Sequence, residues 1–196
     1  MKNNKTWLAI LGGFGTVFLI VVFSMVGWWI HTGNQINQQQ QACDAQWSQV
    51  QNVMQRRADL IPNLTATVKG SMHNEQKIFG EIAKSRQQVL NTNDHKQKMK
   101  ADYKLNQQVG TLINVIHEKY PELASNSNVQ DLMLELESSE NRISVERHRY
   151  IQDVQSYNTM ITNFPNSIVA NGKGDHKIDY YQADNNAQKA PKVNLE

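Results

Sequence analysis

The stretch TWLAILGGFGTVFLIVVFSMVGWWI, residues 6–30, decides how this chain is organised, because it contains no Asp, Glu, Lys or Arg. A helix of about 20 apolar residues spans the hydrocarbon core of a bilayer and makes all of its backbone hydrogen bonds internally. Trp7 stands near one end of the stretch and Trp28 and Trp29 at the other, where indole rings favour the two membrane interfaces. The stretch therefore predicts a transmembrane helix with these tryptophans as interface anchors.

A cleaved signal peptide and a lipoprotein signal are the alternatives for such a stretch. The apolar run is longer than the core of a usual signal peptide, and no small-residue cleavage site follows it. The QQAC sequence that ends at Cys43 comes after a polar segment and matches a lipoprotein motif poorly. We therefore expect an uncleaved, single-pass anchor.

The distribution of basic residues predicts the orientation of this anchor. Lys2 and Lys5 precede the span, whereas residues 31–55 contain no Lys or Arg. Positive charges near the ends of a membrane helix stay on the cytoplasmic side. We expect residues 1–5 to form a short cytoplasmic N-terminus at the cell (inner) membrane, and the remainder beyond the span to be extracytoplasmic or periplasmic.

The overall composition argues against several classes of protein. The chain has 196 residues with 20 Lys plus Arg and 18 Asp plus Glu, so its charge is nearly balanced. No basic stripe predicts binding to nucleic acid. Cys43 is the single cysteine, which excludes an intramolecular disulfide framework. It lies just beyond the span, where the alternatives are a link between two chains and an unpaired thiol.

Beyond the span, residues 31–46 form a polar stalk rich in Gln and Asn. Gln is an adequate helix former, so we favour a helical stalk over a flexible linker. From Trp47 to about Leu90, apolar residues recur at spacings of three and four, which predicts one long helix. Pro62 lies inside this pattern and predicts a kink, because proline removes a helix hydrogen bond. The helix should end near Asn91.

Two further helices follow. One is expected at residues 94–119 and the other at residues 129–163, with Asn128 as N-cap of the latter. A short helical turn at residues 167–170 precedes a polar C-terminal tail, residues 171–196. No useful β-type alternation is present. The predicted fold is all-α: a single transmembrane helix, then an elongated antiparallel bundle of three long helices, with room for a short fourth, over residues 47–170.

Charged residues occupy positions where the apolar seams of these helices pass. Buried charges are tolerated when they are paired and hydrogen-bonded. We interpret these residues as a structural polar network, with coiled-coil character, that sets which helix faces which. Its expected members are Arg57, Glu75, Arg86, Glu118, Glu140, Arg147 and Tyr150.

The alternative for these carboxylates is a metal site. Two-metal helical bundles use Glu-x-x-His pairs, and this sequence has none. A G-x-S-x-G elbow and a glycine-rich loop after a strand are also missing. We therefore expect no catalytic residues, no metal site, no cofactor and no enzymatic activity.

Six features along the chain form an ordered pattern: RRADLIPNL (56–64), VKGSMHNE (68–75), Arg86 after IAKS, EKYPEL (118–123), ENRISVERHRY (140–150) and YNTMITNFP (157–165). Together they resemble the LemA family, over about residues 47–170 and more weakly to residue 193. The chain departs from the family pattern at Ile151, which follows Tyr150 where the family usually has Asn, and at Asp175, which follows Gly174 where the family tends to have Phe. The resemblance implies a membrane-anchored helical bundle of the cell envelope, without a catalytic activity.

Two function classes remain open. The first is an anchored scaffold that organises the envelope, with the lipid bilayer, further copies of itself and other membrane proteins as partners. Small residues of the span, Ala9, Gly12, Gly13 and Gly15, allow spans to approach closely in such a homo-oligomer. The second is a sensor-like module that binds a ligand or a protein between its helices.

Overall fold

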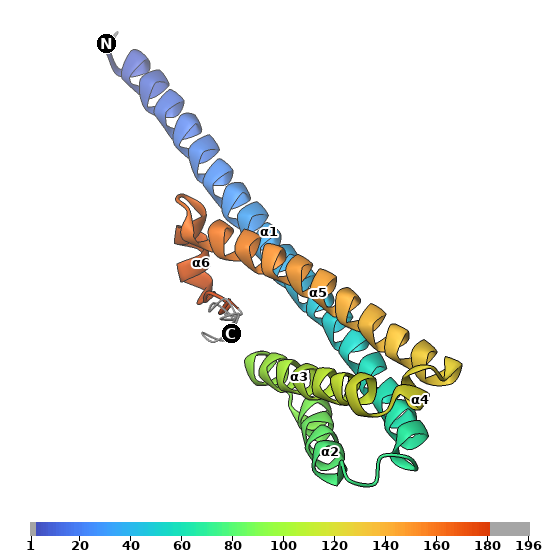
Figure 1. Cartoon of the computed structure of the whole chain (residues 1–196). Coiled ribbons are helices and arrows are strands. Elements are labelled where there is room, and N and C mark those ends of the chain that lie inside the picture. The colour runs from blue at the N-terminus through green and yellow to red at the C-terminus, as the bar shows by residue number, and fades with distance from the viewer. Residues whose placement is uncertain (1–2, 181–196) are drawn as a thin grey trace, which may run out of the picture. The chain divides into compact units, whose positions relative to one another are not determined.

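The computed structural model describes the backbone of residues 3–180 and the side chains of residues 12–180. Within that part of the chain every regular element is a helix, as Figure 1 shows, so the all-α prediction is confirmed. The helices are α1 (Asn3–Lys69), α2 (Gln76–Asn91), α3 (His95–Lys119), α4 (Pro121–Ala124), α5 (Ser127–Thr162) and α6 (Asn166–Lys173).

The N-terminal part of α1 is long and apolar enough to cross a membrane once, and the described residues hold one such helix. Its most apolar window has a mean hydropathy of 2.0 and no buried residue. Phe14, Phe18 and Phe23 are 73%, 67% and 73% exposed. A contiguous apolar surface of this kind needs a cover, and a bilayer provides one. The side chain of Trp7 lies outside the described residues.

Helix α1 runs through the polar stalk, residues 31–46, without a break, so this segment is helix and not a linker. Apolar side chains at its Ile36 and Cys43 are buried. The Gln and Asn residues between them are mostly exposed, which is the pattern of an amphipathic helix.

The prediction of one helix from Trp47 to about Leu90 is wrong. Helix α1 ends at Lys69, a turn covers residues 70–75, and α2 begins at Gln76. At the turn, the N–H groups of Ser71 and Met72 both donate to the carbonyl of Val68 at 3.1 Å. The sequence GSMHN at this point contains the turn formers Gly, Ser and Asn. The apolar period continued across the turn because α2 also buries one face, and this concealed the break.

The starts of α3 and α5 are each fixed by a side chain. Asp94 accepts a hydrogen bond from the backbone N–H of Gln97 at 2.7 Å and is the N-cap of α3, which begins where the sequence predicts. For α5, the predicted cap Asn128 is wrong. Asn126 accepts instead from the N–H groups of Asn128 and Val129, at 3.0 and 3.3 Å. The one-turn helix α4, which starts with a proline, lies between α3 and α5, and the cap of α5 stands two residues earlier than predicted.

Backbone contacts divide the chain into two units, one holding residues up to Asp44 with Asp153–Ile178, and the other centred on residues 45–152. In the second unit, α2 packs against α3, and α3 against α4. Hydrogen bonds join Gln46 to Glu146 and, further along α1, the exposed pair of Arg56 to Glu135, so α1 and α5 are antiparallel. The core of this unit is apolar and includes Val50, Met54, Ala58, Leu64, Ile82, Leu105, Leu112, Ile116, Leu136 and Ile143.

The first unit joins α1 to the end of α5 and to α6. Val169 and Ala170 of α6 are buried. After α6 the chain returns to α5, where the side-chain amide of Asn158 donates to the carbonyl of Ile178 at 2.8 Å and accepts from its N–H at 2.9 Å. The beginning of the C-terminal tail is thus held by one asparagine. Residues 181–196 of the predicted tail lie outside the described residues.

Candidate functional site

A buried charge network lies inside the second unit, and Arg57 is its centre. The Arg57 side chain is 2% exposed, and its two terminal nitrogens form ion pairs with Asp102 of α3 and Glu140 of α5. The same nitrogens donate to the side-chain oxygen of Asn106 at 3.3 Å and to the backbone carbonyl of Asp102 at 3.1 Å. Arg147 of α5 reaches the other oxygen of Asp102 at 3.4 Å. Arg57 therefore holds three helices together.

The network is electrically balanced, because two guanidinium groups face two carboxylates. Removing an ion from water costs several kcal/mol, which is recovered only when partners and hydrogen bonds replace the water. Asp102 satisfies both of its oxygens with arginines, and its side chain is 1% exposed. Glu140 is 31% exposed and forms the edge of the network.

Burial changes the acidity of both carboxyl groups. The pKa of Asp102 is raised above its ordinary value by burial, and the positive charges of Arg57 and Arg147 oppose that rise. The pKa of Glu140 is raised by burial as well, with Arg57 opposing the rise and Asp102 adding to it. Desolvation is thus the largest influence on the acidity of each carboxyl group.

The structure brings together three of the residues that the sequence singles out, namely Arg57, Glu140 and Arg147. Asp102 was missed by the sequence analysis, although it connects the two arginines. Its position follows the period of Leu105 and Val109 along α3, so a charge in that seam was the available signal. Met99, three residues before it, is buried on the same face, so the apolar seam flanks Asp102 on both sides, whereas the prediction followed this seam only from Leu105 onward.

The other predicted members lie elsewhere. Glu75 pairs with Lys119 at 3.5 Å near the turn after α1. Glu118 is exposed and takes no part in the network. Tyr150 belongs instead to an aromatic cluster, whose members are the rings of Trp47, His95 and Tyr150. Trp47 stacks on His95 with ring centroids 4.1 Å apart, and the Tyr150 hydroxyl lies 3.2 Å from Nδ1 of His95.

Arg86 donates a hydrogen bond to α1 at the point where Pro62 interrupts the helix hydrogen bonds. In an α-helix the carbonyl of Ala58 accepts from the N–H four residues later, and that residue is Pro62, which has no N–H. The Nε–H of Arg86, on α2, donates to this carbonyl at 2.5 Å, and its guanidinium lies 3.5 Å from Asp59. Arg86 therefore replaces the hydrogen bond that the proline removes. Helix α1 continues through Pro62 with this carbonyl satisfied, and the bend predicted there stays a prediction.

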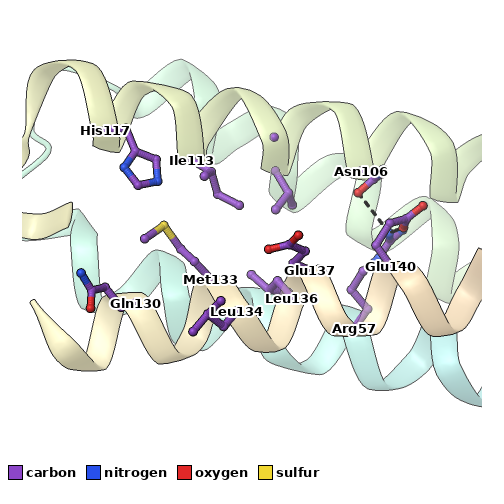
Figure 2. Close-up of a pocket in the computed structure, with 12 residues that line it drawn as sticks. Arg57, Asn106, Ile113, His117, Gln130, Met133, Leu134, Leu136, Glu137 and Glu140 are labelled. Atoms are coloured by element: carbon purple, nitrogen blue, oxygen red, sulfur yellow. Dashed lines mark hydrogen bonds and ion pairs between the residues drawn. The ribbon is translucent and has the colours of Figure 1, made fainter. Parts of the chain in front are cut away.

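An apolar groove of about 470 Å³ opens beside the charge network. Figure 2 shows it between α3, which carries Ile113 and His117, and α5, with Arg57 and Glu140 at one end. Leu134 on α5 is 63% exposed at this groove. Its full lining is Arg57, Asn106, Val109, Gly110, Ile113, His117, Gln130, Met133, Leu134, Leu136, Glu137 and Glu140.

The chemistry available here is that of a binding surface. The groove offers apolar side chains along its length and a hydrogen-bonded carboxylate, Glu140, at its end. Among the side chains of residues 12–180, no three His, Cys, Asp or Glu groups are grouped so that they could hold a metal ion. The groove thus provides shape and apolar contact, with Arg57 and Glu140 at one end, His117 and Gln130 at the other, and Glu137 between them.

Cys43, in the first unit, is 1% exposed. Burial, and then the negative charges of Asp153 and Asp44, raise the pKa of its thiol to about 11. A thiol in this position cannot reach a second chain while the unit is folded. Of the two alternatives for this residue, the structure therefore favours the unpaired thiol.

The fold and the charge network define a class: a helical-bundle protein with one candidate membrane anchor. The model of the LemA family matches residues 46–195, and the chain belongs to that family. The match covers α2 to α6 and the part of α1 that carries Arg57. None of the curated proteins matches the chain.

Proposed function

We propose that this protein is a non-enzymatic scaffold of the cell envelope, anchored in the membrane by α1 and self-associating there. The supporting observation is the continuity of α1. One unbroken helix, Asn3–Lys69, contains the apolar segment and also supplies Arg57 to the bundle. The link between anchor and bundle is therefore helical, which suits a protein that holds partners at a membrane.

The charge network supports the non-enzymatic part of the proposal. General acid–base and nucleophilic catalysis need a group that is free to exchange a proton or attack a substrate. Asp102 is buried and bound by two arginines, and Arg57 is engaged with carboxylates on two helices. These contacts give the charges a structural task, which is to fix the register of α1, α3 and α5.

Self-association is supported by the surface of the anchor. Gly12, Gly13 and Gly15 lie on α1, and no neighbouring atom comes within 4 Å of the point where a Cβ would stand, so a second span could approach the backbone closely. The mass of full-length protein, extracted gently and measured over a range of concentrations, tests this. We expect a species larger than one chain, and a single monomeric species at all concentrations would refute self-association.

The orientation that we propose places the bundle outside the cytoplasm. Because Cys43 is buried, the test needs introduced cysteines in a Cys43→Ala background. Asn74→Cys lies in the exposed turn after α1, and Asn4→Cys precedes the span. A membrane-impermeant maleimide should label position 74 in intact cells and position 4 only after the membrane is opened. The reverse pattern would overturn the orientation.

The groove favours a second candidate, a ligand-binding module that takes a small apolar molecule with one hydrogen-bond donor. Apolar side chains match the body of such a molecule, and the partly exposed carboxylate of Glu140 would accept from its donor. Gly110 borders the groove and has open space where a Cβ would stand. Gly110→Leu should therefore fill the groove and abolish binding of an apolar fluorescent probe such as 1-N-phenylnaphthylamine.

The matched control is Gly80→Leu. Gly80 lies on α2, also has open space at its Cβ position, and does not line the groove. This control should leave probe binding unchanged. Equal probe binding by the parent and Gly110→Leu would show that the groove is not a ligand site.

A further inference from the structure

The segment between α5 and α6 exposes apolar side chains that its own unit leaves uncovered. Phe164 is 81% exposed and Ile168 is 50% exposed, whereas the neighbouring Val169 and Ala170 are buried. One face of α6 therefore packs inward. The other face exposes Ile168 to solvent, and Phe164 is exposed just before the helix begins. An exposed pair of this size is costly in water unless another phase covers it.

Helix α6 packs on the part of α1 that directly follows the apolar segment. The ring of Trp29 lies over Gly172, where an added Cβ would come within 2.8 Å of it. Lys173 donates to the side chain of Asn37 at 2.5 Å and reaches the carbonyl of Gly33 at 3.4 Å. Val169 lies beside Gly33 as well. Figure 1 shows α6 near this stretch of α1.

These contacts give α6 a depth relative to the bilayer. The apolar run of α1 ends at Ile30, and Gly33 is three residues further, which is about 4.5 Å along a helix. The headgroup layer on each side of the hydrocarbon core is roughly 5–7 Å thick. The contacts of α6 on α1 run from Trp29 to Asn37, which is about 10.5 Å past Ile30, so the part of α6 beside Trp29 and Gly33 lies at the level of the lipid headgroups when α1 spans the membrane. Trp29, which favours the same layer, contacts it there.

We propose that the segment Phe164–Ile168 is a second membrane contact, inserted into the interfacial layer of the bilayer that α1 crosses. The occupant of this apolar surface is lipid, because α6 packs on the part of α1 that directly follows the span. Short amphipathic elements bind bilayers in this way, with the apolar face at the boundary between headgroups and acyl chains. The contact fixes the α5–α6 turn at the membrane in addition to the covalent anchor. It depends on the span and not on the proposed scaffold function.

Lys173 of α6 binds groups of the protein itself and is not needed for lipid binding. Its ammonium group is engaged with Asn37 and with Asp175, which lies 3.4 Å away. The interaction with the bilayer therefore rests on apolar burial and not on attraction to anionic lipid. We expect the contact to persist in vesicles of phosphatidylcholine alone and at raised salt, since screening weakens only charge interactions.

The test uses full-length protein reconstituted into phosphatidylcholine nanodiscs at one copy per disc. In a Cys43→Ala background, Phe164→Cys is labelled with the environment-sensitive dye NBD. The matched control is Gln155→Cys, an exposed position on α5 nine residues earlier, or about 13.5 Å at the rise of a helix. We expect NBD at position 164 to emit at shorter wavelength and to lose most of its fluorescence when lipids carry a shallow nitroxide. The dye at position 155 should do neither.

Two outcomes would overturn the proposal. The first is a dye at position 164 that the lipid nitroxide leaves unquenched and that aqueous iodide quenches as strongly as at position 155. The second is a blue shift that occurs only in discs holding two copies and without lipid quenching, because the cover would then be another chain. A failure of self-association in the mass measurement leaves this prediction unaffected, so the two proposals fail separately.

Discussion

The hydrogen bond from Arg86 to the carbonyl of Ala58 provides the sharpest test of how this bundle is built. If Arg86 replaces the bond that Pro62 removes, then its importance must depend on the proline. Arg86→Met keeps much of the side-chain stem and removes the donors. In the parent, this change leaves the Ala58 carbonyl without its donor from α2.

The magnitude follows from the contact. A hydrogen bond from a charged group contributes about 1.5–3 kcal/mol, and leaving a buried acceptor unsatisfied costs about 1–3 kcal/mol. The Arg86 side chain is 31% exposed, so we take the lower part of these ranges. Arg86→Met should reduce the free energy of unfolding by about 2 kcal/mol. In a Pro62→Ala background the new N–H can satisfy the same carbonyl, and the cost should fall to about 0.5 kcal/mol.

Urea unfolding of the four full-length variants in detergent, followed by circular dichroism, measures the coupling between the two positions. The ion pair of Arg86 with Asp59 is lost in both backgrounds and cancels in the comparison. Lys84→Met, an exposed change on the same helix, serves as the control and should alter the stability little. If Arg86→Met costs the same in the parent as in the Pro62→Ala background, the replacement of the missing hydrogen bond is refuted.

Three further predictions follow from the charge network, the groove and the buried thiol. Asp102→Ala leaves the buried Arg57 and the half-buried Arg147 without their shared carboxylate and should destabilise the protein by about 3–5 kcal/mol, whereas Arg56→Ala, in an exposed pair, should cost at most about 1 kcal/mol in the same urea experiment. Equal costs would contradict the burial argument. Gly110→Ala should raise the stability by about 1 kcal/mol, because a helix-interior glycine with open space at its Cβ position gains helix propensity, and a loss of stability would show that the groove does not have that space. Cys43, with a thiol pKa of about 11 against an ordinary 9.0, should be alkylated by iodoacetamide at pH 8 at least about 100-fold more slowly in folded than in urea-unfolded protein, as followed by mass spectrometry, and similar rates would refute its burial. The same shift lowers the stability as pH rises from 9 through 11, since the unfolded chain releases the thiol proton first.

The sequence by itself determined the features that depend on local composition and period. The uncharged run of residues 6–30 specifies a membrane-length helix, because a bilayer leaves the backbone no other way to satisfy its polar groups. The end of α3 at Lys119 is equally local, since Tyr120 precedes Pro121 and is biased out of the helical region. Arg57, Glu140 and Arg147 could also be identified, since a charge in an apolar seam needs partners wherever the seam is buried.

The tertiary structure decided which partners meet. Asp102 holds the network together because α3 packs beside α1 and α5, and no spacing within one helix shows that. Arg86 and Glu75 were predicted members of the network but lie outside it in the structure for the same reason: their partners, the Ala58 carbonyl and Lys119, lie on other elements. The break at Gly70 was concealed because α1 and α2 bury the same kind of face on opposite sides of a turn. Local pattern reports which residues are buried, whereas the path of the chain in space decides what they are buried against.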